Sequence, residues 1–408
     1  MRELLIETLG HLGDGVAKLE GAAVHVPLVL PGERVRGEVV AGRIAGAEIL
    51  VPSPERVLPP CEHYGICGGC ALQHASEAFV AGWKADLVRR ALGARGITGE
   101  VAGVVTWPPG SRRRAVMSGR RLRGGVTVGF HARGSDRLVE IAGCLVLRPE
   151  ILAGREAVAA LTALGSSRKG EVKALVTLSE AGLDIDVREG KPLDAAMRAE
   201  AARIAEAFDL ARLSWEGEVV AQPRPPVIRL GGVRVVPPPG AFLQATREGE
   251  AALVGAVRGI LAGAGRVADL FAGCGTFALA LAAAAEVHAV EGEAPYLEAL
   301  DAAWRNALGL HRITTERRDL FRRPLLGSEL NRFGAVVLDP PRAGARAQAE
   351  ALAASQVPVI AYVSCNPATF ARDARTLVDG GYRMGPVTVV DQFRWSAQLE
   401  LVAGFARP

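Results

Sequence analysis

The sequence lacks any apolar run long enough to cross a bilayer, which takes about 20 residues. The longest candidate covers only residues 277–285. The first eight residues contain two glutamates and do not have the pattern of a secretion signal. Six cysteines in 408 residues are too few for a disulfide scaffold. We therefore expect a soluble cytoplasmic protein, with no membrane association and no obligate protein partner.

Disordered and fibrous structures are excluded as well. Hydrophobic residues make up 49% and charged residues 23% of the chain, as in globular proteins. Glycine and proline are abundant, with 48 and 24 residues, but they follow no Gly-X-Y period, which excludes collagen. The length of 408 residues predicts two or three domains.

Acidic residues are absent from residues 107–134, where seven arginines occur. The net charge of the whole chain is only +4, so this local excess is more informative than the total. Such a segment favours a surface for a polyanion, with RNA as the expected partner, although a solvated arginine-rich face would give the same pattern. The candidate RNA-binding residues are Arg112, Arg113, Arg114, Arg120, Arg121 and Arg123.

Four of the six cysteines have the spacing of metal ligands. Cys61, Cys67 and Cys70 lie within ten residues, and Cys144 follows later in the chain. Four thiolates are enough for a zinc ion or an iron-sulfur cluster. Zinc sites usually combine two Cys-x2-Cys units, and only one is present here, which favours iron-sulfur. Zinc and unligated thiols remain the alternatives.

Proline-rich stretches divide the chain into three predicted domains. Residues 1–52 contain short alternating strands punctuated by glycine and proline, which predict a small OB-like β-barrel. Residues 53–236 are expected to form a mostly β central domain that carries the four cysteines. Within it, the apolar spacing predicts an amphipathic helix at 76–93 and an alanine-rich helix near 194–208.

The third predicted domain, residues 237–408, alternates buried strands with helices. This pattern predicts an α/β fold, a Rossmann-like, doubly wound and mainly parallel sheet. Polar clusters follow the expected strands, and ligands of such sheets bind at the carboxyl ends of the strands. The strands are expected at 266–270, 287–291, 335–339 and 357–363.

Two of these clusters indicate a bound ligand or a catalytic residue. The glycine-containing turn 271–276, followed by an expected apolar helix, would let a ligand approach the backbone, and Glu291 could accept two ribose hydroxyls. Such a turn serves NAD, flavins or S-adenosylmethionine (SAM), and the absence of Gly-x-Gly-x-x-Gly disfavours a dinucleotide. Cys365 precedes a helix whose N-terminus is expected to lower the thiol pKa and make it a nucleophile. A small buried thiol is the alternative.

The C-terminal part, from about residue 240, resembles the RNA (uracil-5-)-methyltransferase family, which has the class I SAM-dependent fold. The matching motifs are Phe242-Leu243-Gln244, Asp269-Leu270-Phe271-Ala272-Gly273-Cys274-Gly275-Thr276, Glu291-Gly292, Leu338-Asp339-Pro340-Pro341-Arg342, Ser364-Cys365-Asn366-Pro367, Asp391-Gln392-Phe393 and Leu399-Glu400. The resemblance implies that Cys365 is the nucleophile and Glu400 the general base. It also implies SAM contacts from Gln244, Phe271, Gly273, Thr276, Glu291, Asp319 and Asp339.

Two further resemblances concern the N-terminal half. Residues 1–52 resemble a TRAM domain, an OB-like RNA-binding barrel, in the turns at 13–17 and 30–33. The four cysteines resemble the [4Fe-4S] centre of the ribosomal branch of the same family. Together they imply 5-methyluridine formation in 23S rRNA through a covalent adduct between Cys365 and C6 of the base.

Two alternatives are kept. One is the same reaction on tRNA. The other is a non-catalytic RNA-binding or ribosome assembly factor. This second alternative arises because residues 392–398, before Glu400, depart from the family pattern Met-Phe-Pro-x-Thr-x-His and lack its proline, threonine and histidine.

Overall fold

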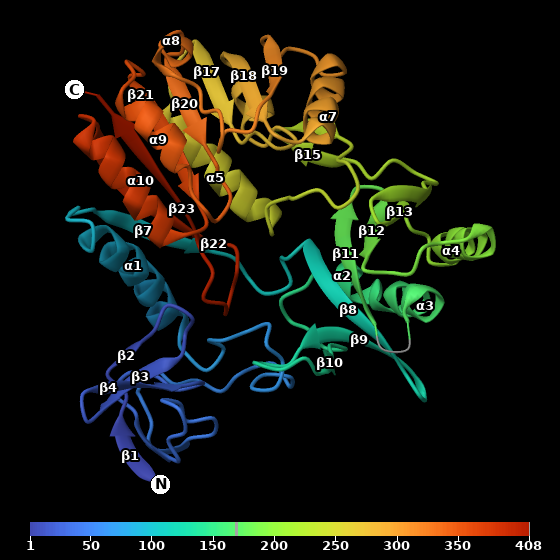
Figure 1. The fold of residues 1–408 in the computed structure, drawn as a ribbon, viewed down its shortest axis with the longest axis vertical. Helices are drawn as coiled ribbons and strands as arrows, with labels where there is room; N and C mark the ends of the chain where they lie inside the picture. The colour runs from blue at the N-terminus through green and yellow to red at the C-terminus, as the bar shows by residue number, and fades with distance from the viewer. Residues whose placement is uncertain (168–169, 408) are drawn as a thin grey trace.

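The computed structural model describes residues 1–167 and 170–407. Figure 1 shows a blue N-terminal region, a central region that is mostly green, and a yellow-to-red C-terminal region. None of the helices in these residues combines the length and the apolar character that a membrane span requires.

The N-terminal region is built from two three-stranded sheets around one small core. Alternate residues of its strands are buried, so apolar side chains such as Val24 and Val26 share one face. Leu4, Val35 and Ile44 complete much of this core. One sheet contains β1 (Arg2–Leu5), β5 (Arg34–Gly37) and β6 (Glu48–Val51), and the other contains β2 (Thr8–Leu9), β3 (Gly15–Leu19) and β4 (Ala22–Val26).

The central region is a seven-stranded sheet covered by helices. Its strand order is β10-β9-β8-β11-β12-β13-β14, and all neighbours are antiparallel except β12 and β13. The strands are β8 (Arg114–Leu122), β9 (Gly125–His131), β10 (Leu138–Glu140), β11 (Glu171–Ser179), β12 (Gly182–Arg188), β13 (Arg212–Trp215) and β14 (Glu218–Ala221). The helices are α2 (Pro149–Ala153), α3 (Arg155–Gly165) and α4 (Ala195–Ala207). Helix α4 confirms the expected alanine-rich helix, and its N-cap Asp194 accepts a hydrogen bond from the Met197 N–H.

The C-terminal region confirms the expected doubly wound sheet. Its strand order is β19-β18-β17-β20-β21-β23-β22-β7, in which only β23 runs antiparallel to its neighbours. The strands are β7 (Val101–Thr106), β17 (Arg266–Leu270), β18 (Glu286–Glu291), β19 (Ile313–Arg317), β20 (Ala335–Leu338), β21 (Val359–Ser364), β22 (Arg383–Asp391) and β23 (Glu400–Ala406). A small hairpin, β15 (Ile228–Leu230) and β16 (Val233–Val235), precedes this region.

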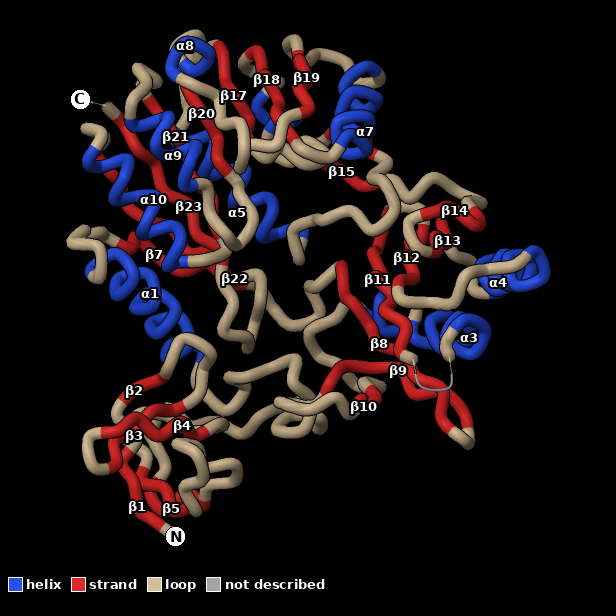
Figure 2. Tube along the Cα trace, in the orientation of Figure 1, coloured by secondary structure: helices blue, strands red, loops and turns tan. Residues whose placement is uncertain are grey.

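Helices cover both faces of this sheet (Figure 2). They are α1 (Glu77–Gly93), α5 (Arg247–Ile260), α6 (Ala278–Leu281), α7 (Ala294–Arg305), α8 (Gly327–Leu330), α9 (Arg346–Ala353) and α10 (Pro367–Asp379). One apolar core lies between the sheet and α1, α8, α9 and α10, and a second lies between the sheet and α5, α6 and α7. The central strands are buried on both faces, which explains their nearly continuous apolar sequences. The apolar helix expected after residue 276 is only four residues long.

Two elements of the predicted central segment join the C-terminal sheet instead. Strand β7 pairs in parallel with β22, and α1 packs beside α10 (Figure 1). Helix α1 confirms the expected amphipathic helix, with the hydroxyl of its N-cap Ser76 accepting a hydrogen bond from the Phe79 N–H. The sheet pairing therefore crosses the boundary expected at residue 237. Strand periodicity shows which residues are buried but not which sheet a strand joins.

Candidate active site

The polar residues that follow the strands of the C-terminal sheet meet at one edge of it. Asp339 follows β20, Cys365 follows β21, and Glu291 ends β18. Glu400 begins β23, which is antiparallel to β21, and Ser364 pairs with Leu401. The start of β23 therefore lies beside the end of β21. This register makes Cys365 and Glu400 neighbours although they are 35 positions apart in sequence.

The environment of Cys365 differs from the expected one. Burial raises the pKa of the Cys365 thiol to about 11, the negative charges of Glu400 and Asp339 add to this shift, and only Arg342 opposes it among the charged neighbours. The expectation that the helix N-terminus lowers this pKa is therefore wrong for the free protein. The N-terminus of α10 is capped locally, because the Asn366 side chain accepts a hydrogen bond from the Ala368 N–H. Burial and neighbouring acids outweigh the helix dipole.

We expect the alkylation rate of Cys365 by iodoacetamide to rise about tenfold per pH unit until the pH approaches the pKa of about 11. Arg342→Gln removes the stabilising cation and should move the midpoint to higher pH. Glu400→Gln removes an anion and should move it to lower pH. Mass spectrometry of the Cys365 peptide measures both shifts, and a wild-type midpoint below pH 9 would contradict this environment.

Glu400 and Asp339 are acids held in poorly solvated positions. Glu400 is 3% exposed, and burial raises its pKa well above the usual range, with the Asp339 charge adding to the effect. A hydrogen bond from Gln392 and the charge of Arg342 act in the opposite direction. Burial also raises the pKa of Asp339 to about 7. A carboxyl with a pKa of about 7, such as that of Asp339, exchanges its proton near neutral pH, which suits acid-base chemistry.

Asp269 is an unpartnered acid beneath the same crevice. It is fully buried in β17, and neither of its carboxylate oxygens has a hydrogen-bond partner. Burial, together with the charges of Asp339 and Glu291, raises its pKa to about 8. Buried polar atoms without partners are rare and often mark the place of a ligand. The acids at the carboxyl ends of these strands thus offer acceptors for a ligand rich in donors or positive charge.

The turn after β17 is shaped by backbone conformations that few residues adopt. Phe271 has a φ of 64°, and Gly275 has a φ of 93°. A Cβ at Gly275 would lie 2.4 Å from Leu300 Cδ1, so only glycine fits there. The Glu291 carboxylate accepts hydrogen bonds from the N–H groups of Gly273 (3.0 Å) and Gly292 (2.7 Å). The turn and Glu291 therefore form one unit, as expected for a nucleotide-type ligand.

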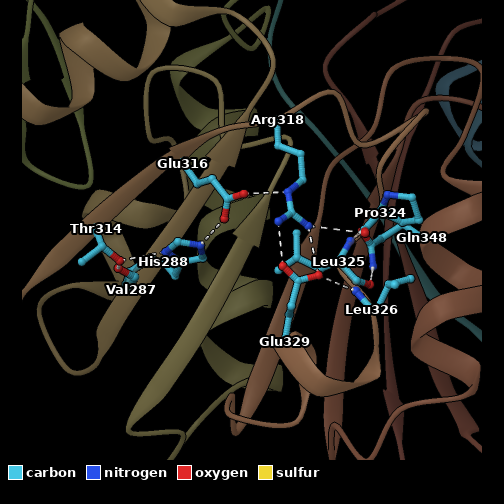
Figure 3. A network of polar contacts seen from close by, with 10 residues as sticks. All are labelled: Val287, His288, Thr314, Glu316, Arg318, Pro324, Leu325, Leu326, Glu329 and Gln348. Carbon is cyan, nitrogen blue, oxygen red and sulfur yellow. Dashed lines mark hydrogen bonds and ion pairs between the residues drawn. The ribbon is translucent and has the colours of Figure 1, made fainter.

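Asp319 is linked to the turn after β17 through Phe321, which lies two positions later in the sequence. The Phe271 and Phe321 rings are 5.4 Å apart, and the Asp319 carboxylate accepts a hydrogen bond from the Phe321 N–H at 2.9 Å. Figure 3 shows the support beneath this loop: Arg318 is fixed between Glu316 and Glu329. This network holds Asp319 and Phe321 next to the crevice.

Gln244 and Thr276 complete the expected ligand-binding set. Gln244 is 3% exposed, and its side-chain oxygen accepts a hydrogen bond from Gln392 Nε2 at 2.5 Å. Gln392 also bonds Glu400, so it joins the two. Thr276 is half-buried in the turn after β17. The sequence marks Gln392 only as part of a motif, because its proximity to Glu400 depends on the packing of β22 against β23.

The four candidate metal ligands line one cavity of about 270 Å³ below β8 and β9. These residues are Cys61, Cys67, Cys70 and Cys144. Burial raises the pKa of the Cys70 thiol to about 12. Throughout residues 1–167 and 170–407, no three or more histidine, cysteine, aspartate or glutamate side chains are arranged to hold a single metal ion. The structure therefore gathers the four thiols without forming a one-ion site.

Some of the candidate RNA-binding arginines contact other side chains of the protein, and others are exposed without an ion pair. Arg112 lines the cysteine cavity and lies 5.8 Å from the Phe393 ring centre, and Arg114 lies 5.3 Å from that of Phe242. Arg120 pairs with Glu171 at 2.8 Å. In the described part of the chain, Arg121 and Arg123 at the β8–β9 turn are exposed and form no ion pair.

Arg113 is the clear exception to the expectation. It is 2% exposed, its guanidinium pairs with Glu250 at 2.6 Å, and it donates a hydrogen bond to the Gln244 carbonyl. A side chain buried in this way cannot reach an RNA phosphate, so the prediction of RNA contact is wrong for Arg113. Its role is to join the central and C-terminal regions.

We expect Arg113→Met to destabilise the protein by about 3–5 kcal/mol, because it leaves the Glu250 carboxylate buried without its cation. Arg121→Met, at an exposed position without an ion pair, is the matched control and should change stability by less than about 0.5 kcal/mol. Urea denaturation measures both. Equal effects of the two substitutions on stability would contradict the distinction between the buried, paired Arg113 and the exposed Arg121.

The comparisons with known proteins agree with this geometry. A family model described as tRNA (Uracil-5-)-methyltransferase matches residues 241–405. An uncharacterized RNA methyltransferase of Mesorhizobium japonicum is 45% identical over 403 residues, covering 99% of this chain and 97% of the relative. The 23S rRNA (uracil(1939)-C(5))-methyltransferase RlmD of Chromohalobacter salexigens is 36% identical, covering 97% and 87%.

A solved structure extends the likeness to the whole fold. The tRNA (uracil-54, C5)-methyltransferase of Pyrococcus abyssi, crystallised with S-adenosyl-L-homocysteine, superimposes with a TM-score of 0.76 over 99% of both chains. The sequence identity is 22%, so the likeness concerns the fold alone.

Proposed function

The chain belongs to the RNA (uracil-5-)-methyltransferase family, and from this premise we propose that it transfers a methyl group from SAM to C5 of a uridine in RNA. The observation that carries the proposal is the adjacency of Cys365 and Glu400 across two antiparallel strands. The chemistry needs a sulfur nucleophile and a base at the same pyrimidine ring. The competing function, a non-catalytic RNA-binding factor, does not require either group.

SAM is the proposed methyl donor. The residues proposed to hold it are Gln244, Phe271, Gly273, Thr276, Glu291, Asp319 and Asp339. Glu291 is placed to accept ribose hydroxyls at the end of β18, and the unpartnered acid Asp269 lies beneath the turn. When bound, SAM supplies an electrophilic methyl group on a positively charged sulfur.

The roles of Cys365 and Glu400 follow from the weakness of uracil C5 as a nucleophile. The Cys365 thiolate adds to C6, and the electron pair of the C5=C6 bond moves toward the C4 carbonyl, which makes C5 enolate-like. C5 then takes the methyl group, and S-adenosylhomocysteine is released. Glu400 removes the C5 proton, the double bond re-forms, and the thiolate leaves C6. The uridine must be unstacked to reach Cys365.

We propose 23S rRNA as the substrate, since the RlmD relative at 36% identity acts on it. The exposed arginines Arg121 and Arg123 at the β8–β9 turn are proposed phosphate contacts. The N-terminal region is proposed to act as a TRAM-like RNA-binding domain, beside a central and a methyltransferase domain. The test is methyl transfer from labelled SAM to 23S rRNA and to tRNA that lack the modification. Transfer to tRNA alone would replace the proposed substrate, and transfer to neither would refute the activity.

The four cysteines are proposed to hold a [4Fe-4S] cluster. They line one cavity, and a cluster binds each of its thiolate ligands to a different iron. The cluster would join residues 61–70 to Cys144 in the central region. It is not needed for methyl transfer, which exchanges no electrons with the protein.

We expect anaerobically purified protein to be brown, with a broad absorbance near about 400 nm and about four irons per chain. Cys70→Ser should lose most of this absorbance because it removes one of the four thiolate ligands. Elemental analysis distinguishes the alternatives: one zinc per chain, or no metal after anaerobic purification, would contradict the cluster.

A further inference from the structure

Lys84 is a buried cation whose contacts all lie at the ends of one segment. It is 0% exposed on α1, on the face that also buries Val80 and Val88. Its Nζ donates hydrogen bonds to Asp391 Oδ1 (2.6 Å), the Gln398 carbonyl (2.8 Å) and the Phe393 carbonyl (3.3 Å). All three ammonium donors are therefore used.

Asp391 lies directly before the segment 392–399, and the other two acceptors, Phe393 and Gln398, lie near its two ends. The segment leads directly into Glu400. Asp391 is the last residue of β22, and Gln398 lies two positions before Glu400. One ammonium thus joins both ends of the segment. Gln392, the first residue of the segment, lies close enough to Glu400 to lower the pKa of its carboxyl. Any shift of the ends would move both Glu400 and its hydrogen-bond partner.

The middle of the segment is held separately. The Trp395 carbonyl accepts hydrogen bonds from the N–H groups of Ala71 (2.8 Å) and Leu72 (3.0 Å). Arg394 donates to the Trp107 carbonyl at 2.9 Å and pairs with Glu77. These contacts come from outside the strands of the C-terminal sheet. The ends, however, depend on Lys84.

We propose that Lys84 is a positioning residue that holds Glu400 at the distance required for removal of the C5 proton. The inference rests on the proposed function. Proton transfer needs a heavy-atom distance of about 2.6–3.2 Å, so a small displacement of the carboxylate is costly. Burying an ammonium costs free energy that its three hydrogen bonds, one of them to a carboxylate, must offset. A mainly stabilising role would be served as well by an apolar side chain at this position.

The test separates proton removal from the earlier steps. The substrate is 23S rRNA carrying tritium at C5 of uridine, and the donor is SAM with a ¹⁴C-methyl group. In Lys84→Met, addition of Cys365 and methyl transfer should slow less than about threefold, whereas tritium release should slow by about 10²-fold. A protein–RNA adduct that contains both labels should therefore accumulate.

Controls keep the outcome decisive. Lys84→Met/Asp391→Asn leaves no unpaired buried carboxylate, so it should fold even where the single variant does not, and it should accumulate the same adduct. Asp391→Asn keeps Lys84 and its two carbonyl contacts and should give an intermediate rate. Lys173→Met, which removes an exposed lysine paired with Glu189, should behave as wild type.

Three results would overturn the proposal. The first is that the folded double variant releases tritium at the wild-type rate. The second is that methyl transfer and tritium release slow equally in Lys84→Met. The third is that neither Lys84 variant folds while Asp391→Asn releases tritium at the wild-type rate. A wild-type enzyme that never methylates uridine would instead refute the proposed function. The wild-type reaction is measured first, so failure of the Lys84 proposal can be distinguished from failure of the proposed function.

Discussion

Cys365→Ala should abolish methyl transfer to RNA, with a loss of at least about 10⁴-fold, because without the sulfur no group activates C5. The same variant should form no stable adduct with RNA that contains 5-fluorouridine, whereas the wild type should be trapped by it. Fluorine cannot leave as a cation, so the elimination that frees the wild-type enzyme is blocked. Denaturing gel electrophoresis of labelled RNA measures the adduct.

The control for this variant is its binding of SAM. Cys365 follows β21 and is not among the residues of the two apolar cores of the C-terminal sheet, so the melting temperature and SAM binding measured by calorimetry should stay close to wild type. Cys365→Ser should be equally inactive, since a hydroxyl is a far weaker nucleophile at this carbon. Substantial turnover by either variant would refute covalent catalysis by this residue.

Glu400→Gln should have the second largest effect and a different signature. The glutamine keeps the shape and the hydrogen bond with Gln392 but cannot take the C5 proton. Addition and methyl transfer should proceed, and turnover should fall by about 10³-fold as the methylated adduct accumulates. The adduct should carry the methyl label and retain tritium at C5.

The outcome that would contradict this role is specific. If Glu400→Gln released tritium at the wild-type rate, another group would be the base, and Asp339, whose pKa is raised to about 7 in the same crevice, would be the next candidate. Asp339→Asn provides the matched comparison. A loss of SAM binding in Asp339→Asn without adduct accumulation would place Asp339 with the donor instead.

The raised pKa of Cys365 in the free protein is compatible with catalysis. In the free protein the thiol is protonated at neutral pH because of burial and the acids Glu400 and Asp339. A positively charged donor in the crevice favours the thiolate. A buried nucleophile that ionises only beside the donor is protected from other electrophiles.

The sequence by itself determined much of this protein. The strands β17, β20 and β21 and the helices α1 and α4 were predicted because continuous apolar runs, helical spacing and side-chain caps act within a few residues. The motifs at 269–276 and 364–367 located the crevice, since the ends of parallel strands meet at one edge of a sheet. Local rules were sufficient wherever the physical cause was local.

Only the tertiary structure decided the features that depend on distant contacts. Arg113 meets Glu250 across 137 positions and Lys84 meets Asp391 across 307, so an arginine expected on the surface and a lysine on a helix are both buried ion-pair partners. The pairing of β7 with β22 and the raised pKa of Cys365 also depend on contacts between residues that are distant in sequence. Burial and charge at a position depend on what packs against it, and sequence periodicity does not specify that partner.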